Sequence, residues 1–256
     1  QMMMSARPIP RSLSMNYSAD LDVSSIEELP PGRTPIKTLL INNVRRKEVI
    51  KFVQQHACLG NQAYWVCPLI EESEKLELEN AINTHEELTN ALAPIKVGLV
   101  HGKMKSKDKA EVMADFTANW TQVLVATTVI EVGVDVPNAS IMVIEHSERM
   151  GLAQLHQLRG RVGRGSTESQ CVLLYEGNPS EVAKQRLKVI SSSNDGFEIA
   201  RQDLLIRGPG ELLGQRQSGL PALRFANLEA DLDILHAARE IAKTLATDYP
   251  AQAKHL

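Results

Sequence analysis

The sequence predicts an α/β protein: a parallel sheet with helices on both faces, followed by a small helical appendage. Short apolar runs rich in β-branched residues recur along the chain, and segments with helical spacing of apolar residues separate them. The runs are continuously apolar rather than alternating, which is typical of strands that are buried on both faces. After residue 178 no further strand pattern occurs, and the remaining periodicity is helical.

Six apolar runs are expected to form the strands of this sheet. They are Thr38–Ile41, Ala63–Ile70, Val97–His101, Val123–Thr127, Ile141–Ile144 and Cys171–Tyr175. Between them, helical faces are expected at Val49–Val53, at Ala110–Phe116 with Ser106 as its N-cap, and at Leu152–Leu158. Beyond the strands, helices are expected over 180–206, with Ser180 as a cap, and over about 230–247.

The first 35 residues have a different composition from the rest of the chain. Five prolines interrupt any periodicity there, so no regular element is expected. We interpret the chain as three parts: 1–35 as the tail of a preceding domain with a linker, 36–178 as the α/β domain, and 179–256 as the helical appendage. Ligands of open parallel sheets bind beyond the carboxyl ends of the strands. We therefore expect three polar loops to lie there: His101–Gly102, Thr127–Thr128 and the arginine-rich segment at 157–165.

Charge and cysteine content limit the function classes. The net charge is −3, so binding to nucleic acid requires local basic patches, such as Arg45–Lys47 and the alternate lysines of 103–109. The three cysteines show no Cys-x-x-Cys spacing and are expected to be reduced packing residues. No apolar run approaches 18 residues, so we expect a soluble, cytoplasmic chain without a membrane span.

Residues 157–165, Gln-Leu-Arg-Gly-Arg-Val-Gly-Arg-Gly, carry the most information about function. Arg159, Arg161 and Arg164 lie within six residues, and glycines between them remove side-chain bulk. Each glycine costs a helix about 1 kcal/mol relative to alanine, so the pattern favours a role that offsets this cost. Guanidinium groups bind phosphate oxygens bidentately and remain charged, so these arginines suit the binding of a nucleoside triphosphate. The alternative is a basic loop on a solvated surface.

A second constellation follows the strand at 123–127. Thr127 and Thr128 end this strand, and Gly133 and Asp135 come a few residues later. Hydroxyl groups and exposed amides at a strand end suit phosphate contacts, and an aspartate beside a glycine suits a ribose hydroxyl. The alternative is a β-turn in which glycine supplies backbone freedom and aspartate bonds within the turn.

The segment Gly98–Lys103 has only a superficial similarity to a phosphate-binding loop. Three residues rather than four separate its glycines, and Met104 stands where serine or threonine is required. No other candidate occurs in the sequence, and no acidic motif for Mg²⁺ does. His101 is therefore interpreted as a turn residue or a nucleic-acid contact rather than a catalytic base.

The order of these segments resembles the second RecA-like lobe of superfamily 2 helicases. The motifs at Thr128–Asp135 and Gln157–Arg164 match the fifth and sixth helicase motifs, and residues 203–219 are similar to the translocation motif of the RecG family. A related motif occurs in Mfd, but Gly208-Pro-Gly-Glu211 is closer to RecG. In the segment that resembles the end of the third motif, Arg7 stands where the family usually has threonine.

The resemblance implies the carboxyl-terminal half of an ATP-dependent DNA helicase that remodels stalled forks and Holliday junctions in repair and recombination. It implies that Arg161 and Arg164 reach the γ-phosphate of ATP, that Gln157 orients this site, and that Gly133 and Asp135 contact the ribose. The phosphate loop and the Mg²⁺ ligands would come from a first lobe outside this chain, so no metal ligand is expected here and the chain alone should be inactive.

The resemblance also implies a DNA-binding and coupling set. Its members are His101, Gly102, Thr127, Thr128, Arg207 and Gln217. The implied partners are branched duplex DNA, and the first lobe and wedge domain of the same protein. Two alternatives remain open: the motor of a Mfd-like transcription-repair coupling translocase, and a nucleic-acid-binding module without enzymatic activity. For the loop after Arg207, the alternative is a connection between helices with no mechanical role.

Overall fold

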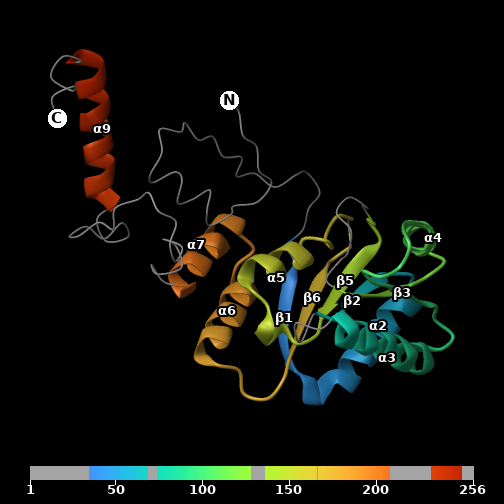
Figure 1. The fold of residues 1–256 in the computed structure, drawn as a ribbon. Helices are drawn as coiled ribbons and strands as arrows, with labels where there is room; N and C mark the ends of the chain where they lie inside the picture. Colours follow the sequence, from blue (N-terminus) through green and yellow to red (C-terminus); the bar gives the residue numbers. More distant parts are fainter. Residues whose placement is uncertain (1–34, 69–73, 128–135, 166, 208–231, 250–256) are drawn as a thin grey trace. The chain divides into compact units, whose positions relative to one another are not determined.

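A computed structural model describes residues 35–68, 74–127, 136–165, 167–207 and 232–249 (Figure 1). The chain divides into two compact units between Ile206 and Arg207. Within the described ranges, the first unit contains the sheet and the helices that pack on it, whereas the second contains the helix labelled α9.

The first unit is built on a six-stranded sheet with the order β1-β6-β5-β2-β4-β3, in which every neighbouring pair of strands is parallel. The strands are β1 (Lys37–Asn42), β2 (Gln62–Val66), β3 (Val97–Val100), β4 (Val123–Ala126), β5 (Ala139–Ile144) and β6 (Gln170–Tyr175). The parallel sheet predicted from the apolar runs is therefore confirmed. The carboxyl ends of β1, β2, β3 and β4 each differ from the predicted boundary by at least one residue.

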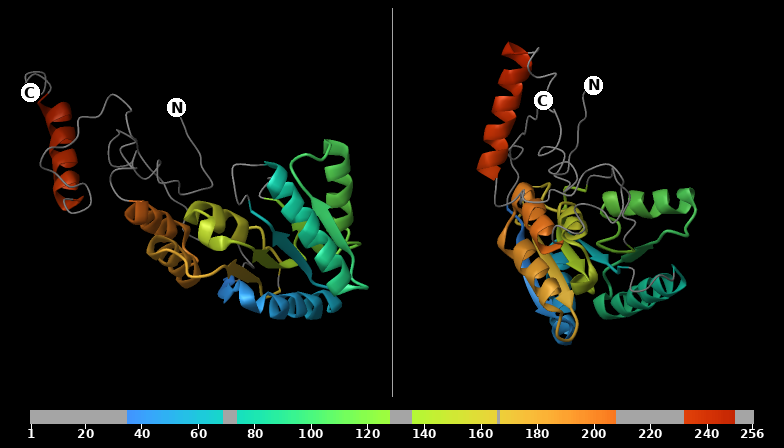
Figure 2. Two further views of the ribbon diagram at one scale, coloured as in Figure 1. Left: turned by 60° about the horizontal axis from the view of Figure 1, so that its bottom comes forward. Right: turned by 60° about the vertical axis from the view of Figure 1, so that its left-hand side comes forward.

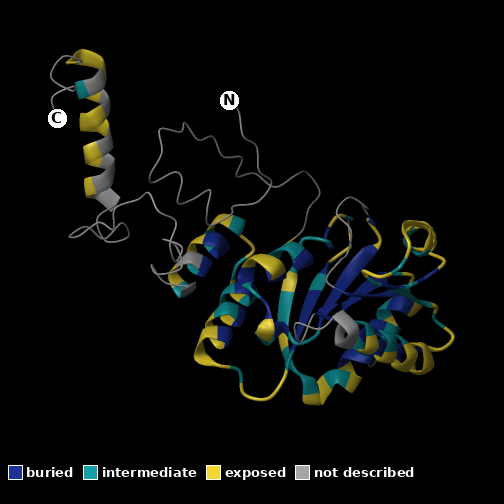
Figure 3. Cartoon of the chain, viewed as in Figure 1, coloured by how far each residue is buried: buried dark blue, intermediate teal, exposed yellow. Residues whose placement is uncertain are grey.

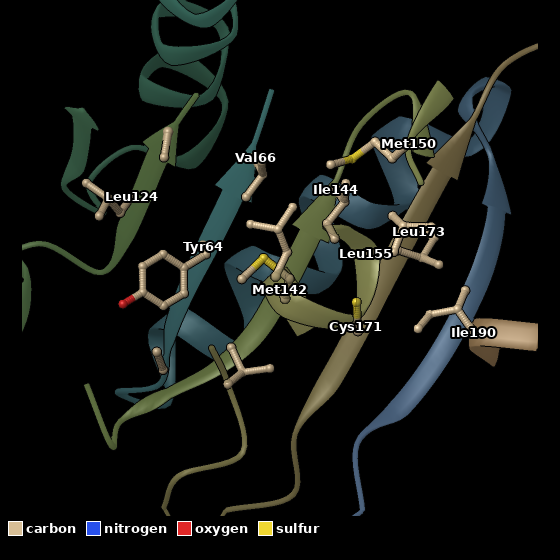
Figure 4. Packing of buried hydrophobic residues seen from close by; sticks show 14 of the residues in the cluster. Tyr64, Val66, Leu124, Met142, Ile144, Met150, Leu155, Cys171, Leu173 and Ile190 are labelled. Carbon is tan, nitrogen blue, oxygen red and sulfur yellow. The ribbon is translucent and has the colours of Figure 1, made fainter. Parts of the chain in front are cut away.

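Alternate residues of the central strands enter two separate cores. In β2, Tyr64 and Val66 belong to one core, while Ala63 and Trp65 belong to the other. Figure 4 shows the first core, in which Tyr64, Leu124 and Met142 come from neighbouring strands. Because both faces are apolar, the central strands are dark blue throughout in Figure 3, and every residue of β2, β4 and β5 is buried. Burial on both faces is the reason that these strands lack an alternating pattern.

Helices cover both faces of the sheet (Figure 2). The face of Trp65 is covered by α2 (Arg46–Cys58) and α3 (Glu74–Leu92). The face of Tyr64 carries the other four helices that the structure describes in this unit. They are α4 (Ser106–Thr117), α5 (Leu152–Arg159), α6 (Glu181–Ser192) and α7 (Gly196–Arg207). Two short 3-10 turns, η1 (Asn43–Arg45) and η2 (Ser147–Arg149), follow β1 and β5.

Three features of the helices differ from the sequence predictions. The 19-residue α3 was not predicted, because charged residues interrupt its apolar positions. The single pattern expected over 180–206 forms two helices, α6 and α7, and the turn between them includes Ser193 and Asp195. Ser106 is the first residue of α4 rather than its N-cap, which is Lys105. Ser180 does cap α6, because its hydroxyl accepts a hydrogen bond from the Ala183 amide.

The second unit contains α9 (Leu232–Asp248), close to the predicted range of 230–247. Its sequence places apolar residues at helical spacing, and Ile234 and Ile241 are exposed. The small helical appendage expected after the sheet thus includes a helix of 17 residues.

Candidate nucleotide and nucleic-acid interfaces

The arginine segment lies at the amino-terminal edge of the sheet. Helix α5 begins after the carboxyl end of β5 and runs back along the sheet, so its last residue, Arg159, reaches the start of β1. There the Arg159 guanidinium lies 3.4 Å from the Thr38 hydroxyl. The next residues continue along the same edge, where the backbone of Lys37 bonds to the carbonyl of Ser169. The expectation that this segment lies beyond the carboxyl ends of the strands is therefore wrong.

The glycines of the segment allow it to lie close to residues that precede two strands. The backbone of Gly163 has φ +79°, a left-handed conformation that residues other than glycine rarely adopt. A Cβ at this position would lie 3.0 Å from the Ile36 side chain. At Gly165, a Cβ would collide with the backbone carbonyl of Pro137, just before β5. The segment therefore packs against the amino ends of β1 and β5, and Arg164 lies between its two contact points.

The three arginines have different environments. The Arg159 side chain is only 2% exposed and donates hydrogen bonds to the Ile190 carbonyl at 2.6 Å and the Ser193 carbonyl at 2.8 Å. It thereby satisfies carbonyls that the end of α6 leaves without helical partners. Burial lowers the pKa of the Arg159 guanidinium from its ordinary value. Burial also raises the pKa of the neighbouring Cys171 thiol to about 12, although the positive charge of Arg159 partly opposes this rise. Arg159 is therefore a structural residue, and its interpretation as a phosphate ligand is wrong.

Arg161 and Arg164 are the arginines that remain accessible on this edge. Arg161 is half-buried and Arg164 is exposed, and they follow the end of α5 directly. Gln157 is half-buried in the last turn of the same helix. The structure thus brings the three residues that we expect at the γ-phosphate onto one short segment. Their roles stay predictions.

A second group of predicted residues lies at the opposite edge. The Thr127 amide donates to the Val100 carbonyl at 3.2 Å, which places Thr127 beside His101 where β3 and β4 end. Thr127 is buried and His101 is half-buried, whereas Gly102 is exposed in the turn that leads to α4. Since four strand residues span about 13 Å, this group is separated from the arginine segment by the length of the sheet. The two groups therefore form two sites rather than one.

Sequence reasoning missed a polar pocket of about 250 Å³ at the carboxyl edge. It is lined by Asn43, Arg46, Cys67, Pro68, Asn80, Asn83, Thr84, Glu87, Glu145 and His146. Glu145 accepts hydrogen bonds from Arg46 and from the Trp65 indole, each at 2.9 Å, and Arg46 also pairs with Glu87. Burial lowers the pKa of Arg46, but its two glutamates raise this pKa by more. The guanidinium therefore stays charged, and the carboxylates of Glu87 and Glu145 balance its charge inside the pocket.

This pocket lies where the connections of a doubly wound sheet diverge. The chain leaves β2 toward β3 on one side, and leaves β5 toward β6 on the other. Ligands often bind at such a point, and the polar residues that follow β2 and β5 were a usable signal. Burial and an adjacent carboxylate raise the pKa of Cys67, which makes this thiol a poor nucleophile.

Several predicted residues lie outside the described part of the chain. These are Thr128, Gly133, Asp135 and Gln217, together with Arg7. Arg207 is the last residue of α7, but its side chain is outside the description as well. Among the residues that the structure does describe, no cluster of histidine, cysteine, aspartate or glutamate has the arrangement of a metal site. In that same part, no helix has the length and apolar character needed to cross a membrane.

Comparison with known proteins identifies the family to which this α/β domain belongs. The model of the helicase conserved C-terminal domain matches residues 39–166, which include the sheet as far as the arginine segment. The chain belongs to the helicase C-terminal domain family. A second model, domain 3 at the C-terminus of the ATP-dependent DNA helicase RecG, matches residues 193–255 of this helicase chain.

Individual relatives are similar over almost the whole chain. The ATP-dependent DNA helicase RecG of Escherichia coli strain K12 is 57% identical over 100% of the chain, and that of Bacillus subtilis strain 168 is 46% identical over 94%. The helicase chain spans 37% and 36% of the lengths of these relatives. A solved structure of RecG bound to a three-way DNA junction has a TM-score of 0.70 and 45% identity. The match covers 91% of this chain and 30% of that one.

Proposed function

We propose that this helicase chain is the second motor lobe and translocation segment of a longer ATP-dependent DNA helicase that remodels branched DNA. One observation carries the proposal: the chain is similar along nearly its whole length to RecG, including a RecG that was solved on a three-way DNA junction. In this proposal the longer protein acts on stalled forks and Holliday junctions during repair and recombination. Since its substrate is chromosomal DNA, its place of action is the cytoplasm.

The amino-terminal edge of the sheet would face the nucleotide. Gly163 and Gly165 hold the segment against the sheet so closely that only glycine fits at Gly165 without displacing backbone, and Arg164 is exposed between them. A segment held this way presents cationic groups without much loss of conformational entropy on binding, which fits a triphosphate. Bound ATP supplies a phosphoryl group for transfer to water. Arg161 and Arg164 would stabilise the negative charge on its γ-phosphate, and Gln157 would orient the site.

Other contacts of the nucleotide fall to residues outside the described chain or outside this sequence. Gly133 and Asp135, which precede β5 in the sequence, would meet the ribose. A first lobe elsewhere in the longer protein would hold the Mg²⁺ ion that accompanies ATP. In this proposal that lobe, together with a wedge domain, is the intramolecular partner of the chain.

The carboxyl-terminal edge would face DNA. His101, Gly102 and Thr127 meet where β3 and β4 end, and Thr128 follows directly in the sequence. Backbone amides and hydroxyl groups of this kind contact phosphates without reading sequence, as a motor that moves along DNA requires. Arg207 and Gln217, beyond the last strand, would couple nucleotide-driven motion of the lobes to movement of duplex DNA.

The isolated chain is expected to show no ATP hydrolysis above background, because its sequence lacks a phosphate loop and one half of the composite site is therefore absent. The full-length protein is expected to hydrolyse ATP faster when fork-shaped DNA is added. Steady-state phosphate release, measured for both proteins with and without such DNA, checks this. ATPase activity in the isolated chain, or a full-length protein that DNA does not stimulate, would contradict the proposal.

A further inference from the structure

The two outer strands of the sheet differ at their free edges. At one side β3 has only four residues, and the His85 ring nitrogen lies 3.1 Å from the Val97 carbonyl oxygen, which points away from β4. At the other side β1 has six residues, none of which is buried, and Leu40 is 39% exposed. A long outer strand with few charges is a template for a further strand, and proteins commonly shorten or cover such an edge.

The register of β1 against β6 shows which of its backbone groups lack a partner in the sheet. The Lys37 amide donates to the Ser169 carbonyl at 3.0 Å, and alternate residues of β1 repeat this pattern. The amides and carbonyls of Thr38 and Leu40 therefore point away from β6. No backbone hydrogen bond from the described residues reaches these groups. Thr38 and Leu40 thus present donors and acceptors with the spacing that a further strand requires.

The side chains of β1 extend the apolar surface of both sheet faces to this edge. Leu39 and Ile41 are half-buried at the rim of the core that contains Trp65. Leu40 points to the opposite face, on which α6 packs against β1. A strand added to β1 would meet apolar side chains on both faces, so β-branched residues suit its central positions.

The position of α6 favours a single peptide over a second copy of this chain. A two-fold dimer through β1 would pair the two strands antiparallel and place both α6 helices on the same face. The helices would then lie about one strand spacing, roughly 5 Å, apart. Packed helices need about 8 to 10 Å between their axes, so the two copies would clash. A single extended segment occupies only the layer of the sheet and leaves α6 in place.

Basic side chains flank the free edge of β1. Lys37 is exposed at the start of the strand. On α6, Arg186 donates to the Glu148 carbonyl in η2, which follows an inner strand, so this side of α6 faces the sheet interior. Lys188 is exposed two residues later, about 200° around the helix, and lies on the outer side. Among the described residues, neither lysine forms an ion pair, so a partner with carboxylates would complement this charge.

We propose that the outer edge of β1 binds an extended segment of another protein, which adds a further strand to the sheet. The segment is apolar and β-branched at its centre and carries acidic residues that meet Lys37 and Lys188. Hydrogen bonds between its main chain and that of Thr38 and Leu40 supply affinity, and its side chains supply specificity. The inference does not depend on the proposed function, since it involves neither the nucleotide nor DNA.

The test is the binding of a fluorescein-labelled peptide to the full-length protein, measured by fluorescence anisotropy. The peptide is about as long as β1 and consists of valine and threonine with aspartate at both ends. Leu40→Pro removes an outward amide but no hydrogen bond to β6, and proline is tolerated at such positions of an outer strand. This variant should raise the Kd for the peptide about tenfold or more. Leu40→Ala, which keeps the amide, should raise the Kd by a smaller factor.

Modified peptides test the same contact on the wild-type protein, so the result does not depend on the folding of Leu40→Pro. Two peptides carry N-methyl groups on opposite sets of alternate residues, and only one set faces β1. One methylated peptide should lose binding and the other should keep it. A peptide with asparagine in place of aspartate should bind more weakly at low salt, because it cannot pair with the lysines.

Hydrogen exchange and thermal unfolding complete the experiment. The Leu40 amide should exchange rapidly in the free full-length protein and slowly when the peptide is bound, and Leu40→Pro should unfold near the wild-type temperature. Slow exchange in the free protein would mean that another part of the longer protein already covers β1, and this would overturn the proposal. Absence of binding, or equal affinity of both methylated peptides, would overturn it as well.

Discussion

If the proposed function holds, replacing Arg164 by alanine in the full-length protein is expected to lower kcat for DNA-stimulated ATP hydrolysis by about a thousandfold. The KM for ATP should change little, because the arginine is expected to act on charge that develops during phosphoryl transfer rather than on the ground state. Arg164 is exposed on a segment that two glycines hold against the sheet, so its removal leaves no cavity. Steady-state kinetics over a range of ATP concentrations separates the two constants.

The control for this experiment is Arg201→Ala, which removes an exposed arginine of α7 that pairs with Glu198 on its own helix. Its kcat should stay near the wild-type value. If Arg164→Ala keeps its turnover, the arginine segment is a solvated basic loop and the nucleotide does not bind at this edge. A rise in KM with unchanged kcat would instead make Arg164 a ligand of the ground state.

Replacing Arg159 by alanine is expected to lower the free energy of unfolding by about 3 kcal/mol. The Arg159 side chain is buried, and its loss leaves the Ile190 and Ser193 carbonyls at the end of α6 without their donor. Denaturant unfolding of the isolated chain, followed by circular dichroism, measures the change. Arg159→Lys should restore only part of the stability, because an ammonium group lacks the fork that reaches several acceptors.

Arg201→Ala is the control for this experiment as well. It breaks an exposed ion pair within one helix, and such a pair contributes less than about 1 kcal/mol to the free energy of unfolding. A loss at Arg159 as small as the loss at Arg201 would show that solvent replaces the buried hydrogen bonds.

The strands were predictable from the sequence because their signal is local. A run such as Val123–Ala126 is apolar at every position, and only a strand covered on both faces needs that composition. The cap at Ser180 was equally local, since a serine that accepts from an amide three residues later requires nothing from the rest of the fold. Helix α3 was not predicted, although its buried residues Ala81, Leu88 and Leu92 lie at helical spacing, because polar and charged residues separate them.

The sequence indicated which residue types form the candidate sites, but it indicated less well where those residues lie in the fold. The sequence by itself determined that Arg161 and Arg164 occur in a glycine-rich segment after a helix, and that His101 and Thr127 follow strands. It contained no sign that the arginines and the strand-end residues occupy opposite edges. Because α5 returns along the sheet before the arginine segment begins, the direction of one connecting helix separates the two groups.

Arg159 shows the same division between sequence and tertiary structure. Along the chain it is one of three equivalent arginines, and its glycine neighbours favour phosphate binding for all three. Its partners are carbonyls near residue 190, about thirty positions later, and they approach only because α6 packs beside α5. Composition and periodicity decide which segments are strands or helices, since these depend on near neighbours. The edge on which a side chain lies, and whether it is buried, depends on how distant segments pack, so only the tertiary structure decides it.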